Sequence, residues 1–188
     1  MTVWLVTSLH RSGSSMMMRC LEAGGMHAVY GHEQDFLNVL CGRDGYQPNP
    51  GGFYALDDAM EFSRPDFAAE YDGCLAKIPA WSALSLAPGD YRILFMRRDQ
   101  GEILASMAEF TPFSVFALEG AVWFYDLVAP ALVRALEAHG ATVDVVDYGA
   151  VVKDPATVLS ELAKAGWPIE ATKAAAVVDP AQYRSVAS

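Results

Sequence analysis

The sequence predicts an α/β protein, a single-domain three-layer sandwich with a mainly parallel sheet of four or five strands between helices. Apolar, strand-like runs alternate with helix-like segments along the chain, and this order favours parallel strands joined by helical crossovers. The two strongest runs, residues 2–8 and 91–97, are largely apolar, which is typical of strands buried on both faces. With 188 residues and no repeat or linker, we expect one domain over residues 1–188.

The first part of the chain supplies two of the expected strands. Residues 2–8, TVWLVTS, form the first strand, and a helical pattern then begins at Ser14 and ends at a Gly-Gly pair. A short second strand is expected at residues 27–31. Residues 41–52, CGRDGYQPNPGG, are dense in turn-forming residues and predict a loop.

The middle of the chain predicts two more buried strands and two helices. The strands are residues 73–78, GCLAKI, and 91–97, YRILFMR, and a helix follows at residues 100–110. Residues 119–138 predict a long helix that bends at Pro130, because proline cannot donate the backbone hydrogen bond of a continuous helix.

The C-terminal part predicts the last strand and a well-marked helix. Residues 142–148, TVDVVDY, form the strand. Residues 154–166 form the helix, with Asp154 as its N-cap, Pro155 at its first position and Gly166 closing it. Ligands of parallel sheets bind beyond the carboxyl ends of the strands. The segments that follow strands are therefore the candidates for function.

Charge and composition restrict the class of partner. A net charge of −10 argues against a nucleic-acid-binding protein, which needs a basic surface. The most apolar stretch, residues 116–136, carries Glu119, Asp126 and Arg134 and predicts a buried helix rather than a membrane span. Three scattered cysteines without a C-x-x-C pair, and a start without a basic leader, favour a cytoplasmic protein with reduced thiols and no metal site.

The segment after the first strand, LHRSGSSMM, has the composition of an anion-binding loop. Backbone N–H groups gather there at the positive end of the following helix. Gly13 lets the backbone approach an anion closely, Ser12, Ser14 and Ser15 can donate hydroxyl hydrogen bonds, and Arg11 adds a fixed positive charge. An ordinary tight turn with a capping serine is the alternative. The loop lacks the lysine and second glycine of the nucleoside-triphosphate motif, which favours a terminal phosphate or sulfate held without a metal.

A second candidate follows the strand at residues 91–97. Arg98 stands at the end of that strand, and Ser106 comes eight residues later in the next helix. The two side chains could hold one phosphate together. The alternative is that the arginines at this strand end are solvated or form salt bridges with Asp99 and Glu102, and the motif by itself favours this alternative. The phosphate interpretation gains support because the pair lies at the same predicted sheet edge as the first loop.

Several motifs in series resemble the sulfotransferases that use 3′-phosphoadenosine 5′-phosphosulfate (PAPS), in particular a bacterial branch. RSGSSMMMRCLEAGGM is similar to the 5′-phosphosulfate loop of that family, and FMRRDQGEILAS to its 3′-phosphate motif. NPGGFY, AKIP, VVDYGAVVKDP and VVDPAQYR resemble further motifs in the family's order. The resemblance extends from about residue 3 to residue 184. Gln100, Gly149, Ala150 and Ala55 depart from the family's pattern, and the chain is short for it.

The resemblance implies a fold, an activity and a co-substrate. The fold would be that of the P-loop-containing nucleotide hydrolases. The activity would be metal-independent transfer of a sulfuryl group from PAPS to a hydroxyl or amine of a small-molecule or carbohydrate-like acceptor. Arg11, Ser12, Gly13, Ser14 and Ser15 would bind the 5′-phosphosulfate. Arg98 and Ser106 would bind the 3′-phosphate, and Arg184 would also belong to the residues that bind the donor.

Transfer to a hydroxyl also needs a base and a stabilising cation. Glu33, in GHEQD after the second strand, is the first choice for the base, and His32, Asp35 and Asp57 are the alternatives. Lys77, at the end of the strand at residues 73–78, could neutralise charge on the leaving group. All of these could instead be solvated surface residues.

Two other classes of function stay open from the sequence. A small P-loop kinase would hold Mg²⁺ with Ser14 or Ser15 and with Asp147 at the end of the last strand. A non-catalytic nucleotide-binding or scaffold protein would keep the fold without turnover. Binding of ATP only with Mg²⁺ would indicate the kinase, and donor binding without product would indicate the scaffold.

Overall fold

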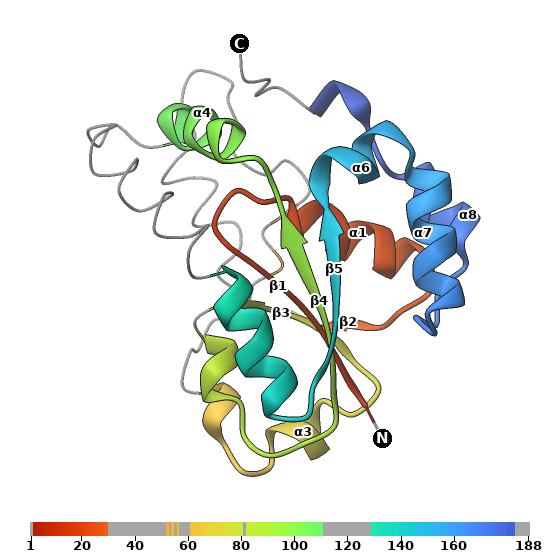
Figure 1. Ribbon diagram of the computed structural model, residues 1–188. Coiled ribbons are helices and arrows are strands. Elements are labelled where there is room, and N and C mark those ends of the chain that lie inside the picture. The colour runs from red at the N-terminus through yellow and green to blue at the C-terminus, as the bar shows by residue number, and fades with distance from the viewer. Residues whose placement is uncertain are drawn as a thin grey trace.

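The computed structural model describes residues 2–29, 52, 54, 56, 61–80, 82–110 and 129–182. Within this part of the chain, five strands form one parallel sheet in the order β2-β3-β1-β4-β5. Helices flank the sheet (Figure 1), which fits a three-layer sandwich. The fold class predicted from the sequence is thereby confirmed as α/β with a parallel sheet.

The strands are short, and the central strand, β1, leads into the candidate anion-binding loop. Their bounds are β1 Val3–Ser8, β2 Ala28–Val29, β3 Leu75–Pro79, β4 Tyr91–Arg97 and β5 Thr142–Asp147. Because β1 pairs with β3 on one side and β4 on the other, its loop lies between the ends of both neighbours.

The helices differ in length and in how strongly the sequence marks them. Their bounds are α1 Ser14–Ala23, α3 Phe67–Glu70, α4 Gln100–Phe110, α6 Tyr148–Lys153, α7 Pro155–Lys164 and α8 Ala171–Ala176, with 3₁₀ turns at Glu61–Ser63, Ser82–Ser85 and Pro180–Gln182. Residues 129–138 are also helical. The parallel strands all end at the same edge of the sheet, their carboxyl edge, and α4 lies beyond that edge (Figure 1).

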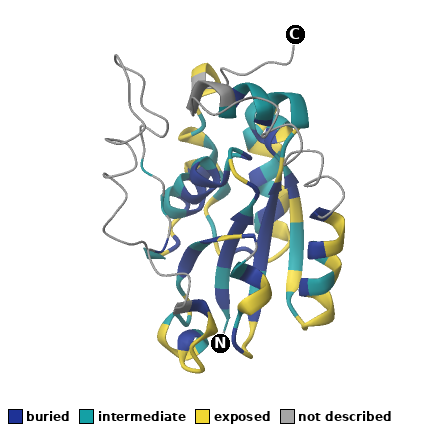
Figure 2. Ribbon diagram, turned by 90° about the vertical axis from the view of Figure 1, so that its left-hand side faces the viewer, coloured by how far each residue is buried: buried dark blue, intermediate teal, exposed yellow. Residues whose placement is uncertain are grey.

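Two apolar clusters cover the two faces of the sheet. On one face, Val3, Leu5 and Phe95 pack with the helix at residues 129–138 and with the segment around α3. On the other face, Val6 and Leu94 pack against α1, α7 and α8. Alternate residues of each strand thus enter opposite clusters, as the period of a strand requires. Figure 2 shows buried residues along the central strands and exposed ones on the outer sides of the helices.

Most predicted elements agree with the structure. β4 and α4 have the predicted bounds, and α7 begins at Pro155 after Asp154, whose carboxylate accepts a hydrogen bond from the Thr157 backbone N–H at 3.1 Å. The strand predicted at residues 142–148 ends one residue earlier, because Tyr148 already begins α6. Only residues 129–138 of the predicted long helix are described, so the bend at Pro130 stays a prediction.

Two further predictions lie partly or wholly outside the described residues. Of the second strand expected at residues 27–31, Ala28–Val29 are described and form β2. The loop at residues 41–52 lies outside the described part except for Gly52. Across the residues that are described, no helix combines the length and apolar character needed to cross a membrane.

Candidate anion-binding site

The loop between β1 and α1 turns sharply at two residues with positive φ. Arg11 has φ 64° and Gly13 has φ 91°, and the Ser12 N–H donates to the Leu9 carbonyl at 3.3 Å. Gly13 is the N-cap of α1 and supplies no side-chain cap. The first N–H groups of a helix have no partner within the helix. The backbone N–H groups at the N-terminus of α1 can therefore donate to an anion beside the loop.

The surroundings of Gly13 give a second reason for a glycine here, besides the predicted close approach to an anion. A Cβ atom built at this position would clash with the ring of Tyr148, the first residue of α6. The positive φ of Gly13 also disfavours any residue with a side chain. The loop conformation therefore depends on contact with α6, which follows the last strand of the sheet.

The two predicted phosphate motifs meet in the structure. The Arg11 Nε donates to the Ser106 Oγ at 2.9 Å, although the two residues are 95 positions apart. An Arg98 Nη1 group donates to the Arg11 backbone carbonyl at 2.9 Å. The loop after β1 and the start of α4 thus form one polar site at the carboxyl edge of the sheet.

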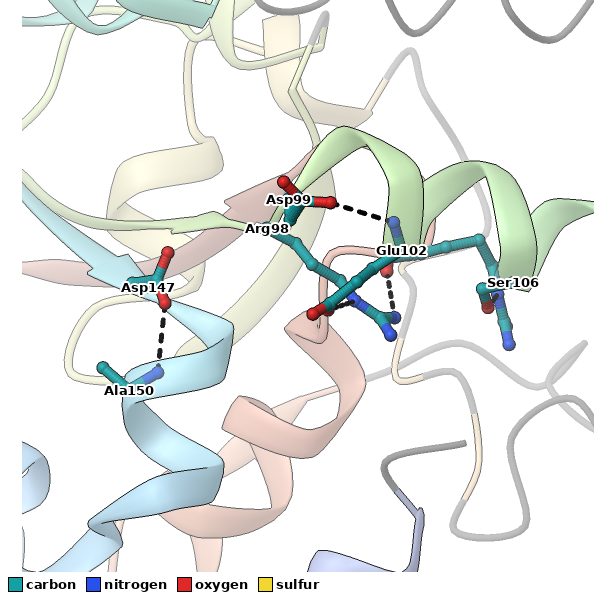
Figure 3. A network of polar contacts seen from close by, with 7 residues as sticks. Arg98, Asp99, Glu102, Ser106, Asp147 and Ala150 are labelled. Atoms are coloured by element: carbon teal, nitrogen blue, oxygen red, sulfur yellow. Dashed lines mark hydrogen bonds and ion pairs between the residues drawn. The ribbon is translucent and has the colours of Figure 1, made fainter. Parts of the chain in front are cut away.

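Arg98 is part of the framework of this site. Its Nε lies 2.9 Å from the Glu102 Oε2, and both side chains are nearly buried, with exposed fractions of 7% and 12% (Figure 3). The guanidinium carbon lies 4.4 Å from the centre of the Tyr148 ring, a cation–π contact. Asp99 instead caps α4, since its carboxylate accepts from the Glu102 backbone N–H at 3.2 Å. The salt bridge considered from the sequence therefore forms with Glu102.

Lys77 reaches the loop from the other neighbouring strand. Parallel pairing places Lys77 of β3 beside Val6 of β1, and its Nζ donates to the Ser15 Oγ at 2.9 Å. Lys77 thus contacts the first turn of α1, and Arg98 contacts the loop before it, because β3 and β4 flank β1.

The cations of the site repel one another. Burial, and next the charge of Arg11, lower the pKa of Lys77 to about 7. Burial, and next the charges of Lys77 and Arg11, lower the pKa of His10 below its ordinary value. An anion placed among these groups would relieve the repulsion and favour their protonated forms. The electrostatics therefore suit a phosphate or sulfate.

One polar group in the loop lacks a partner. The Ser12 side chain is 1% exposed, and its hydroxyl oxygen has no hydrogen-bond partner. A buried hydroxyl without a partner costs free energy, of the order of 1–3 kcal/mol. The Ser14 and Ser15 residues are also buried, at 9% and 8% exposure.

The structure brings together most of the residues that the sequence singled out, namely Arg11, Ser12, Gly13, Ser14, Ser15, Lys77, Arg98 and Ser106. The remaining candidates, Glu33, His32, Asp35, Asp57 and Arg184, lie outside the described residues, so their roles stay predictions.

Sequence reasoning missed the site roles of three residues. His10 adjoins the loop and shares its electrostatics, and its position next to Arg11 was an available signal. Tyr148 packs on Gly13 and Arg98, and its place in the motif VVDYGAVVKDP was an available signal. Glu102 was considered as a salt-bridge partner, and the structure makes it part of the framework that holds Arg98.

Comparison of the chain with protein-family models, with curated proteins and with solved structures gave no match. The functional argument therefore rests on the geometry and chemistry of the site.

The lowered pKa of Lys77 predicts that anion affinity depends on pH. A bound anion would raise this pKa from its value of about 7 in the free protein, so binding would take up a proton wherever the free amine is neutral. Affinity for adenosine 3′,5′-bisphosphate (PAP) is expected to fall between pH 7 and 9, with a slope approaching tenfold per unit, and the contribution of Lys77 should level off below pH 7. The phosphates are almost fully ionised in this range because their second pKa is about 6.

Titration calorimetry in two buffers of different ionisation enthalpy measures this proton uptake directly. The control is Lys77→Gln, which should bind PAP more weakly but with a flat pH profile. A slope of equal size in the variant and the parent would contradict the assignment to Lys77.

Proposed function

We propose that the protein transfers a sulfuryl group from PAPS to an acceptor hydroxyl or amine, using a P-loop-like site without a metal. The observation that carries this proposal is the hydrogen bond from Arg11 to Ser106 at 2.9 Å. It joins two predicted anion-binding motifs that are far apart in the sequence, and PAPS carries two anionic groups on one nucleotide.

The division of the site supports a donor with two anionic ends. The loop at residues 9–15 and Lys77 lie over the ends of β1 and β3, and this side would hold the phosphosulfate. Arg98 and Ser106 lie beyond β4, and this side would hold the 3′-phosphate. Arg98 also donates a hydrogen bond to the Arg11 carbonyl. It would therefore contact the 3′-phosphate directly and hold the loop that binds the phosphosulfate.

The transfer step needs one base and a stabilised leaving group. The acceptor oxygen attacks the sulfur of PAPS, and the bond between sulfur and the bridging phosphate oxygen breaks. The electron pair stays on that oxygen in PAP, where Lys77 and the N–H groups at the start of α1 would stabilise the developing charge. The acceptor proton passes to the base, for which Glu33 is our first candidate.

The position of Asp147 argues against the kinase alternative. A kinase of this fold would use that carboxylate to hold Mg²⁺. In the structure, Asp147 caps α6 and accepts from the Ala150 backbone N–H at 3.0 Å (Figure 3). Its carboxylate also lies 3.9 Å from the Arg97 Nε.

A thermal-shift series tests the proposed function. PAPS and PAP are expected to raise Tm at concentrations where AMP and ATP do not, because only a ligand of the native state stabilises it. Mg²⁺ should not change the result for PAP. A rise in Tm with ATP only when Mg²⁺ is present would overturn the proposal in favour of a kinase.

Ser106→Ala tests the site of the 3′-phosphate. Loss of a charge-assisted contact is expected to cost about 1.5–3 kcal/mol of binding, and it should weaken PAP more than AMP. Ser160→Ala, on α7, is the control and should leave both affinities unchanged. Equal weakening of both nucleotides would show that Ser106 acts only by holding Arg11.

A further inference from the structure

A cavity lies beside the anion-binding site, at the carboxyl ends of β4 and β5. It has a volume of about 840 Å³, within the range of small-molecule sites. The start of α4 and the helix at residues 129–138 form two of its walls. Ser12 and Arg98 line it as well, so the cavity meets the proposed phosphate contacts at these two residues.

Apolar and polar side chains both line the cavity, and the apolar ones include buried residues. Leu9, Phe95 and Ile103 are buried residues of its lining, and Val133 lies on the adjoining helix. Val145 of β5 also lines it and is 50% exposed, which is unusual for a large apolar side chain on a strand. An apolar ligand would cover this side chain and gain the free energy of its burial.

The rim of the cavity carries two exposed arginines. Arg134 is exposed and forms no ion pair with any described residue. Arg97 is 66% exposed, and its one ion pair within the described part of the chain is the 3.9 Å contact with Asp147. The two carboxylates of the lining, Asp99 and Asp147, each accept a backbone N–H at the start of a helix. In a chain of net charge −10, this rim favours an acidic group.

The unsatisfied hydroxyl of Ser12 lies where the cavity meets the anion loop. Ser12 lines the cavity, and its oxygen is buried without a hydrogen-bond partner among the described residues. Native proteins rarely leave a buried polar atom unsatisfied, and exceptions often mark functional positions.

We propose that this cavity binds the body of the acceptor, and that the acceptor is an apolar small molecule carrying an acidic group. That the ligand is an acceptor rests on the proposed function. The class of ligand, an apolar small molecule with an acidic group, rests on the cavity alone. The apolar body would lie against Phe95, Ile103 and Val145, and the acidic group would lie at Arg134 and Arg97. The reacting hydroxyl would then point toward the loop at Ser12.

The fluorescent anion 8-anilinonaphthalene-1-sulfonate is a suitable probe because it is apolar and acidic. We expect it to bind the native protein and to be displaced by naphthalene-2-sulfonate at concentrations at least tenfold lower than by 2-naphthylmethylammonium. Equal displacement by the anion and the cation would overturn the proposed ligand class.

Two matched pairs of variants locate the probe. Val145→Glu is expected to weaken probe binding at least tenfold, whereas Leu84→Glu, at a similar exposure of 46% outside the cavity, should not. Arg134→Gln should weaken it about threefold or more, whereas Lys164→Gln on α7 should not. Unchanged circular dichroism and Tm confirm that each variant folds. Equal effects within the pairs would mean that the probe binds elsewhere and would overturn the proposal.

Adding PAP separates this proposal from the proposed function. PAP and the probe are expected to bind together, and displacement of the probe by PAP would assign the cavity to the nucleotide and overturn its role as an acceptor site. If PAP does not bind at all while the variants of the cavity still weaken the probe, the proposed function fails. The acceptor role then fails with it, and the site for an apolar anion stands.

Discussion

Replacing Glu33 by glutamine is expected to lower turnover by about 10²–10⁴-fold, the usual contribution of a general base, while PAPS affinity stays nearly unchanged. Glutamine keeps the shape of the side chain but cannot accept the proton of the acceptor. The measurement is the rate of PAP formation, and hydrolysis of PAPS serves as the readout until an acceptor is identified. Glu137→Gln, a change of the same kind on the helix at residues 129–138, is the control.

Two outcomes would contradict the assignment of Glu33 in different ways. If Glu33→Gln turns over like the parent while His32→Gln or Asp57→Asn is inactive, the base is another residue of the same group and the proposed activity stands. If none of these variants and no variant of Lys77 changes turnover, the protein does not catalyse this transfer.

The position of the site could be predicted from the sequence because parallel topology determines it. Once the segments at residues 2–8, 73–78 and 91–97 are strands of one parallel sheet, their carboxyl ends share an edge. Arg11, Lys77 and Arg98 then have to lie near one another, as they do.

The partners of these side chains could not be predicted in the same way. A long side chain such as Arg98 has several acceptors within reach, and it takes Glu102 and the Arg11 carbonyl. This choice depends on Tyr148, whose ring lies beside the guanidinium. Tyr148 reaches that position through α6, a six-residue helix that is too short to give a periodic pattern. The lowered pKa of Lys77 likewise depends on burial, which the sequence alone does not give.

Helix signals explain which helices the sequence predicted. α7 has an Asp-Pro start and an apolar periodic face, and both features are local. α8, at Ala171–Ala176, lacks a side-chain cap and packs against α1 and α7. Its formation depends on those tertiary contacts rather than on local signals.

Gly13→Ala is expected to abolish measurable PAP binding and to destabilise the protein more than the same change elsewhere. The positive φ of Gly13, 91°, costs an alanine about 1–2 kcal/mol. The added Cβ also clashes with the Tyr148 ring, and overpacking of this kind costs a further ~1–3 kcal/mol. The ring cannot move freely because the Arg98 guanidinium lies against it. Displacing Arg98 would release the Arg11 carbonyl and distort the anion loop.

Gly25→Ala measures the cost of a positive φ without the cost of a clash. Gly25 has a positive φ of 109°, but a Cβ there would meet no atom within 4 Å. Denaturant unfolding should therefore show the backbone cost alone for Gly25→Ala and both costs for Gly13→Ala, with PAP binding lost only in the latter. In a Tyr148→Ala background, Gly13→Ala should cost less stability than in the parent, because the clashing ring atoms are absent and only the backbone strain remains. Equal destabilisation by the two alanine variants, with PAP binding intact in both, would mean that contact between Gly13 and Tyr148 does not hold the loop in its binding conformation.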